Sequence, residues 1–157
     1  MGGALGGGSS ISPTMGTMIP TEGGAREDRD SATDAYLRFW SVAYSLDAHP
    51  VIEWRSRLAA VTTDPLLPQL LSALQAQHTS GIREYGQVRP QPVTVEVHGD
   101  LATVVDCQDA SGAGEAYADS GMPKTVGRAR TPIAASLRRD ADGQWRVSEA
   151  KELDSTC

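Results

Sequence analysis

The sequence predicts an α+β fold in which three N-terminal helices cover one face of a curved antiparallel sheet of four to five strands. Apolar residues recur at helical spacing between residues 31 and 80. After Gly81 the period of the apolar residues changes from 3.6 to 2, and polar turn sequences separate the alternating runs. Helices followed by a curled meander pack naturally as a cone-shaped half barrel.

The first 30 residues are expected to be a flexible arm or linker. Half of the 16 glycines lie there, and the segment contains no aromatic residue. Such a composition buries too little apolar surface to offset the entropy lost on ordering. We therefore expect a folded domain over residues 31–157.

Three helices are expected in the first half of that domain. Ser31 or Thr33 can cap the first helix, Pro50 suits the start of the second, and the third runs from about Pro65 to Ser80. Each carries an apolar stripe, formed in turn by Tyr36, Phe39, Trp40, Ala43, Tyr44 and Leu46, by Val51, Trp54, Leu58 and Val61, and by Leu67, Leu70, Leu71, Leu74 and His78.

The second half of the domain reads as strands. Residues 82–88 form a first, edge strand, and a hairpin over residues 93–108 turns at Gly99-Asp100. A loop of small and polar residues, 110–126, leads to a strand over residues 128–139 and a last strand that contains Trp145 and Val147.

The expected core takes side chains from both layers. It comprises Trp40, Tyr44, Trp54, Leu70, Leu74, Val95, Val105, Ile133, Leu137, Trp145 and Val147. In this phase of the alternation Val105 and Cys107 point into the cone, and Asp106 points away from it.

Composition and charge exclude some classes of partner. The formal net charge is -6, so no basic field is present to hold nucleic acid. No apolar run is long enough for a transmembrane segment, and the start of the chain lacks the features of a signal peptide.

Three stretches resemble a family of small actinobacterial exported proteins and lipoproteins of unassigned function. They are residues 35–40 (AYLRFW), residues 102–112 (ATVVDCQDASG) and residues 142–148 (DGQWRVS), together with the terminal Cys157. These proteins look like members of the nuclear transport factor 2-like (SnoaL-like, cystatin-like) superfamily. The resemblance covers about residues 31–157. It implies a cone fold and export to the cell envelope; a cytoplasmic or virion location is the alternative.

The resemblance also bears on the two cysteines. An even number of cysteines in a chain that resembles exported proteins favours a disulfide between Cys107 and Cys157. The alternative is two free thiols, one buried in a strand and one at the chain terminus. A catalytic role for Cys107 is disfavoured because no histidine lies near it in sequence.

Candidate site residues are few. Superfamily enzymes commonly hold an acid or base in the cone, and Asp106 is the weak catalytic candidate by position, although an outward side chain would instead orient the following glycine loop. Trp40, Tyr44, Trp54 and Trp145 are candidates for lining a pocket, with a place in the core as the alternative. No histidine pair has metal-ligand spacing, so neither metal nor cofactor is expected.

We therefore expect a non-enzymatic binding or accessory domain whose partner is a protein or a small apolar ligand. One alternative is a SnoaL-like isomerase, cyclase or hydratase that uses the cone, with Asp106, Tyr85 or His78 as its acid or base. Another is a structural component of a larger, phage-like assembly with the N-terminal arm as tether. Superfamily members often dimerise through the sheet, so the resemblance also implies a homodimer as one form of assembly.

Overall fold

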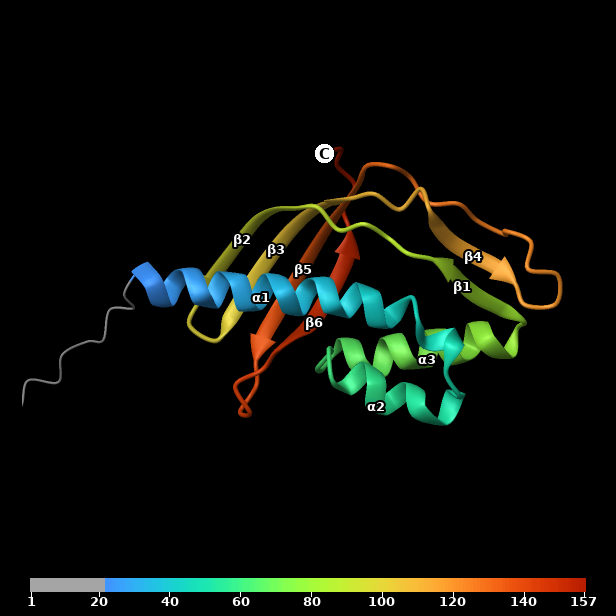
Figure 1. The fold of residues 1–157 in the computed structure, drawn as a ribbon, viewed down its shortest axis with the longest axis horizontal. Helices are drawn as coiled ribbons and strands as arrows, with labels where there is room; N and C mark the ends of the chain where they lie inside the picture. The colour runs from blue at the N-terminus through green and yellow to red at the C-terminus, as the bar shows by residue number, and fades with distance from the viewer. Residues whose placement is uncertain (1–21) are drawn as a thin grey trace, which may run out of the picture.

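A long helix lies across one face of a twisted sheet in the computed structural model, which describes residues 22–157 (Figure 1). The helical elements are α1 (Glu22–Ala43), two 3₁₀ turns (Leu46–Ala48 and Val51–Glu53), α2 (Trp54–Ala59) and α3 (Leu66–Thr79). The strands are β1 (Ile82–Gly86), β2 (Pro92–His98), β3 (Leu101–Gln108), β4 (Ala113–Tyr117), β5 (Thr131–Arg139) and β6 (Trp145–Glu152). The expected α+β class and its three α-helices are confirmed.

The first helix begins earlier than expected. The boundary placed at residue 30 falls inside α1, which starts at Glu22. Two contacts stabilise residues 22–30 of α1. The Thr33 hydroxyl donates to the Arg29 carbonyl at 2.7 Å, and Asp28 forms an ion pair with Arg139 of β5 at 2.9 Å. The rest of the expected arm, residues 1–21, lies outside the described residues.

The strands form two antiparallel sheets. The larger has the order β2-β3-β5-β6, and β1 pairs with β4 in a separate two-stranded sheet. The larger sheet has four strands, within the expected four to five, but the second sheet was not predicted, because β4 lies in the stretch expected to be a loop. Its sequence, Ala-Gly-Glu-Ala-Tyr, is too rich in small residues to show an alternating pattern. Gly114 is needed there, since a Cβ would overlap the Thr125 carbonyl.

The inward face of β3 is the opposite of the expected one. Ala102, Val104 and Asp106 are buried under the helices, whereas Val105 is 41% exposed. Alternation fixes which residues share a face but not which face is covered. The polar Asp106 is accommodated inside because the Tyr36 hydroxyl and the Gln91 backbone N–H donate hydrogen bonds to its carboxylate.

The core has two parts. The first lies between α1 and the larger sheet and includes Tyr36, Phe39, Leu137, Trp145 and Val147. The second lies beneath α2 and α3 and consists of Leu46, Trp54, Leu58 and Leu71. The expected inward positions on β5 and β6 are thus confirmed.

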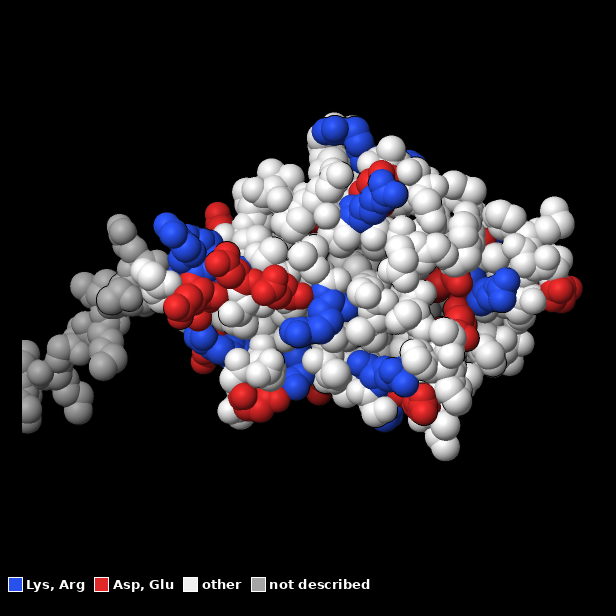
Figure 2. Space-filling model, in the orientation of Figure 1, with Lys and Arg blue, Asp and Glu red and all other residues white. Residues whose placement is uncertain are grey.

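Charges are mixed across the surface. Figure 2 shows Lys and Arg side chains interspersed with Asp and Glu on the viewed face, with several opposite charges in contact. Within residues 22–157, no helix has the length and apolar character needed to cross a membrane.

Candidate functional site

An apolar hollow of about 180 Å³ lies where the C-terminal part of α1 meets α3. We call it the apolar hollow; its walls are Phe39, Trp40, Ala43, Tyr44, Leu66, Leu70, Leu74, Glu84 and Ala150. The helical period explains this lining. Leu66, Leu70 and Leu74 recur every four residues and so lie on one face of α3. Ala150 closes the hollow from β6, and β1 contributes Glu84, the one carboxylate of the lining.

Glu84 is the one carboxylate of the apolar hollow, and its surroundings shift its pKa. Burial raises the pKa of its carboxyl, Gln77 opposes that rise, and the nearby carboxylates of Glu115 and Asp47 add to it. Burial, together with Glu84 and Glu115, also raises the pKa of Tyr44 to about 12. At neutral pH Tyr44 therefore keeps its proton, and Glu84 holds a proton to a higher pH than a solvated glutamate does.

A second hollow of about 420 Å³ adjoins the first. We call it the polar hollow; its walls are Trp40, Tyr44, Gln108, Ala110, Val126, Gly127, Arg128, Thr131, Ile133 and Glu152. Trp40 and Tyr44 belong to both linings, so the two hollows meet at these rings. The Arg128 guanidinium forms an ion pair with Glu152, which neutralises the two charged groups of this wall.

Two N–H groups at the polar hollow lack a hydrogen-bond partner among the described residues. They are the amide nitrogen Nε2 of Gln108 and the indole Nε1 of Trp40. Gln108 is 3% exposed, so its unpaired amide is a buried donor. The Trp40 side chain lies beside the Tyr36 hydroxyl and opposes the rise in the pKa of Tyr36 that burial and Asp106 cause.

Asp106, the weak catalytic candidate, is fully buried and therefore does not point outward as expected. Its Oδ2 accepts a hydrogen bond from the Tyr36 hydroxyl at 2.6 Å, and its Oδ1 accepts one from the Gln91 backbone N–H at 2.5 Å. Burial raises the pKa of the Asp106 carboxyl, and these two bonds oppose the rise. Neither Asp106 nor Tyr36 lines either hollow, so the pair holds α1 against β3 instead of facing a ligand.

The structure brings together two of the four expected pocket residues. Trp40 and Tyr44 line both hollows. Trp54 is 2% exposed in the second core and donates its indole N–H to the His49 carbonyl at 3.0 Å. Trp145 is buried in the first core, where the Arg139 guanidinium lies 4.9 Å from the centre of its ring. It also borders a separate hollow of about 250 Å³ between α1 and the turn before β6, apart from Trp40 and Tyr44.

The other acid–base candidates lie outside both hollows. The Tyr85 hydroxyl donates to the Thr125 carbonyl at 2.9 Å. The His78 ring packs edge-on against Trp54, with 5.3 Å between the ring centres. Within the described part of the chain, no group of three His, Cys, Asp or Glu side chains is arranged to hold a metal ion. Glu84 and Gln108 could not be predicted as lining residues from the sequence, because a polar residue on an alternating strand is typical of a solvent-facing position.

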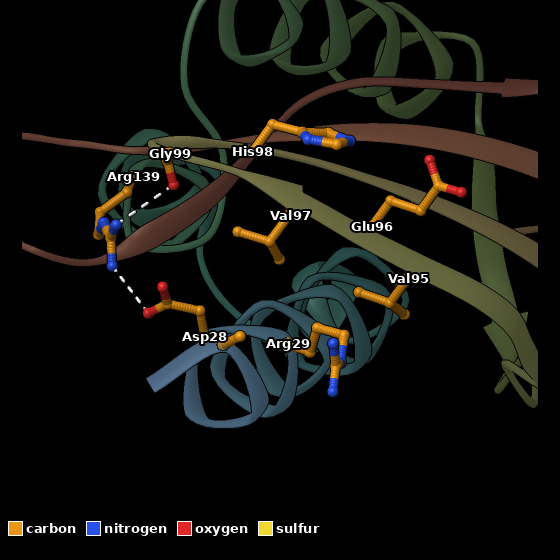
Figure 3. A pocket seen from close by; sticks show the side chains of 9 residues that line it. Asp28, Arg29, Val95, Glu96, Val97, His98, Gly99 and Arg139 are labelled. Atoms are coloured by element: carbon orange, nitrogen blue, oxygen red, sulfur yellow. Dashed lines mark hydrogen bonds and ion pairs between the residues drawn. The ribbon is translucent and has the colours of Figure 1, made fainter. Parts of the chain in front are cut away.

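A hollow of about 490 Å³ between the start of α1 and β2 is a weaker candidate. Figure 3 shows Arg139 there, pointing to Asp28 and to the Gly99 carbonyl, at 2.9 and 3.2 Å. The same guanidinium also bonds Asp100 at 2.9 Å. The Arg139 guanidinium is thus already paired with protein groups. These contacts tie the start of α1 to the larger sheet.

The two cysteines meet near the end of the chain. The Sγ atoms of Cys107 and Cys157 lie 2.10 Å apart, at disulfide distance. Cys107 is on β3, and the tail that carries Cys157 is also held by a 2.7 Å bond from Arg130 to the Cys157 carbonyl. The pairing would close a loop of 50 residues around β4, β5 and β6.

No family model matches the sequence, and no curated protein matches it. Solved structures with the same arrangement exist at low identity. The intermembrane space region of chloroplast protein ARC6 is 17% identical, with a TM-score of 0.53, over 83% of this chain and 97% of that one. A nuclear transport factor 2-like protein from Cytophaga hutchinsonii is 13% identical, with a TM-score of 0.55, over 80% and 96%.

Two further solved structures have the same arrangement. A ketosteroid isomerase-like protein from Erwinia carotovora atroseptica is 14% identical, with a TM-score of 0.52, over 82% of this chain and 98% of that one. A structure from Catenulispora acidiphila in complex with S-DNPA is 12% identical, with a TM-score of 0.52, over 81% and 92%. Identities this low establish the fold alone. The chain has the cone fold shared by nuclear transport factor 2-like and ketosteroid isomerase-like proteins.

Proposed function

We propose that this chain is a non-enzymatic binding domain that takes a small apolar ligand into the apolar hollow, and that it acts in the cell envelope. The observation that carries the proposal is the lining. Seven of its nine side chains are aliphatic or aromatic without a charged or hydroxyl group, and Tyr44 and Glu84 supply the polar groups. Ligand sites are typically apolar with a few polar groups that orient the ligand.

The shared fold supports this proposal. The neighbour from Catenulispora acidiphila was solved in complex with S-DNPA, so one protein of this fold accommodates an added molecule. Cys107 and Cys157 at disulfide distance support the location, because disulfides persist in oxidising compartments. The resemblance to small exported proteins agrees with that assignment.

Catalysis is the second candidate function, and one observation favours it. Glu84 is a carboxyl of raised pKa in an apolar wall, as a general acid or base requires. The binding proposal is preferred because the expected acid–base residues do not join Glu84: Asp106 is sealed in the core, and Tyr85 and His78 lie outside the lining.

Filling the apolar hollow should weaken the binding of an apolar probe. N-phenyl-1-naphthylamine, whose fluorescence rises in apolar surroundings, is titrated into wild type, Leu70→Trp and Leu67→Trp. Leu67 is the matched control, because it is a half-buried leucine of α3 that does not line the hollow. We expect Leu70→Trp to weaken probe binding by about ten-fold or more in Kd, a loss of about 1.4 kcal/mol, because the indole occupies the space that the probe would fill.

Leu67→Trp should leave Kd nearly unchanged. Thermal unfolding establishes that each variant is folded, and Ala150→Leu fills the same hollow from β6 if Leu70→Trp fails to fold. Equal weakening by Leu70→Trp and Leu67→Trp, or no probe binding by wild type, would contradict the proposal.

A further inference from the structure

The larger sheet has a covered edge at β6 and an open edge at β2. At β6 the segment that follows α2 closes the edge: Thr63 donates its backbone N–H to the Val147 carbonyl, and the Val147 N–H donates to the Val61 carbonyl. β2 is the last strand on the other side, and it pairs with β3 alone. Within residues 22–157, no backbone group of residues 93–98 makes a hydrogen bond beyond that edge.

The open edge presents the main chain of two valines. The hairpin turns at Gly99-Asp100, so His98 and Leu101 on either side of the turn form a hydrogen-bonded pair, and every second residue back along β2 bonds to β3 in the same way. The residues between them, Val95 and Val97, therefore direct their N–H and C=O groups away from β3. These are the groups that a further antiparallel strand would bind.

Apolar side chains accompany these main-chain groups. Val95 and Val97 lie on the side of β2 that faces α1, whereas Glu96 and His98 point to the other side (Figure 3). Val93, at the next alternate position, is 67% exposed. β2 contains no lysine or arginine to keep a bare edge from pairing, and its proline stands at its first position. A valine-rich edge without such protection is typical of a strand that pairs with another chain.

The start of α1 supplies a surface for an added strand to cover. The hollow of about 490 Å³ beside β2 is lined by Ala25 and Arg29 of α1 together with residues 95–99. Figure 1 shows that α1 begins beyond β2 and then passes across the sheet. A strand added at this edge therefore packs against the first turns of α1 instead of standing free in water.

The charges at this edge are self-complementary. Asp28 is paired with Arg139, whereas Arg29 and Glu96 form no ion pair in the part of the chain that the structure describes. One unpaired cation and one unpaired anion on a surface match the same surface of a second copy across a two-fold axis. A wholly acidic or wholly basic partner would complement only one of them.

The sequence of β2 also fits its own copy. Val95 is the middle residue of the strand, so a two-fold axis through Val95 pairs β2 along its whole length. In that register valine faces valine, and Glu96 faces Thr94 of the second copy, so no like charges stand opposite each other. An axis through Glu96 would instead oppose two carboxylates, which is destabilising.

We propose that this chain forms a homodimer in which β2 pairs with β2 of a second copy in antiparallel, so that two four-stranded sheets become one continuous sheet. The paired edge shares no lining residue with the apolar hollow, so the dimer does not depend on the proposed ligand. It differs from a dimer in which two sheets stack face to face, because the outer face of each sheet stays open to solvent.

Sedimentation velocity of the full chain over about 1–300 µM tests the dimer. Pairing of one short edge buries less than a standard interface of roughly 1,200–2,000 Å², so we expect a Kd on the order of 10 µM. Wild type should therefore change from monomer to dimer within this range. A wild type that stays monomeric throughout would overturn the inference.

Opposite charges at one position locate the interface. Thr94→Glu places a carboxylate opposite Glu96 of the second copy, once on each side of the axis, and Thr94→Lys places an ammonium group there. Thr94 is exposed, so neither change removes packing. Because the two cross-strand pairs act together, Thr94→Glu should weaken dimerisation by about 2- to 30-fold and Thr94→Lys should strengthen it.

Val105→Lys is the matched control. Val105 lies beside Thr94 on β3 and is 41% exposed, but it stands one strand in from the edge. Its replacement should leave the dimer Kd nearly unchanged, and thermal unfolding establishes that each variant is folded. Dissociation of the dimer by Val105→Lys, or equal weakening by both Thr94 variants, would assign a face-to-face dimer and overturn edge pairing.

Discussion

Replacing Cys157 with serine should lower the free energy of unfolding by about 4 kcal/mol if the pair is oxidised, because the bond closes a loop of 50 residues in the unfolded chain. For a domain of this size the unfolding midpoint should fall on the order of 10 °C. Cys157 is exposed, so its replacement removes little packing. Cys107→Ser would be less informative because Cys107 is buried.

The thiol state and the stability are measured together. Intact mass after alkylation without reduction should show no label on wild type. Wild type treated with a phosphine reductant should unfold near the midpoint of Cys157→Ser, while the reductant leaves the variant unchanged. Two labelled thiols in wild type, or equal midpoints for wild type and Cys157→Ser, would show that the bond is absent and would remove a support for the oxidising compartment.

Removing the hydroxyl of Tyr36 should destabilise the fold by about 1–3 kcal/mol at neutral pH, because Tyr36→Phe leaves the buried Asp106 with one donor fewer. The loss should shrink at low pH. Burial already raises the pKa of Asp106 above its ordinary value of 3.8, and the bond from Tyr36 restrains that rise. Without this bond the pKa of Asp106 in the folded state rises further.

The sign of the pH dependence follows from proton linkage. Because the folded state holds the Asp106 proton more tightly than the unfolded chain, the free energy of unfolding falls as pH rises from about 3.8 through the folded-state pKa. In Tyr36→Phe this fall extends to higher pH. Urea unfolding between pH 4 and pH 7 should therefore give a penalty that grows with pH.

Tyr85→Phe is the matched control, since the Tyr85 hydroxyl donates to a neutral backbone carbonyl. Its penalty should be small and independent of pH over the same range. A Tyr36→Phe penalty that is equal at pH 4 and pH 7 would mean that Asp106 does not change its charge there.

Elements could be predicted from the sequence where the local pattern of apolar residues matches the burial in the fold. The stripe of α1, the hairpin at Gly99-Asp100 and the inward faces of β5 and β6 follow from the period of their apolar residues. The stripe of α3 is confirmed in part: Leu71 is buried, but His78, expected on the same buried side, is exposed. The start of α1 was placed too late because residues 1–30 are rich in glycine and have no aromatic residue, which is typical of a linker. The ion pair of Asp28 with Arg139, which holds this part of α1, joins residues far apart in the sequence and leaves no local pattern.

The site was harder to predict, for a physical reason. On β3 both alternating faces contain apolar residues, and only the tertiary bonds from Tyr36 and Gln91 explain why Asp106 is inside. Trp40 and Tyr44 could be named from helical spacing. Glu84 and Gln108 become site residues only when β1 and β3 are brought against α1, which no local pattern encodes.

The most direct test of ligand binding in the apolar hollow is a nuclear magnetic resonance titration with N-phenyl-1-naphthylamine. The indole N–H signal of Trp40 and the methyl signals of Leu70 and Leu74 should shift together and saturate with one affinity. The signals of Val93 and Leu101, which are 67% and 60% exposed on the larger sheet, should remain in place. Shifts confined to Val93 and Leu101, or no saturable shift at Trp40, would contradict the proposed site.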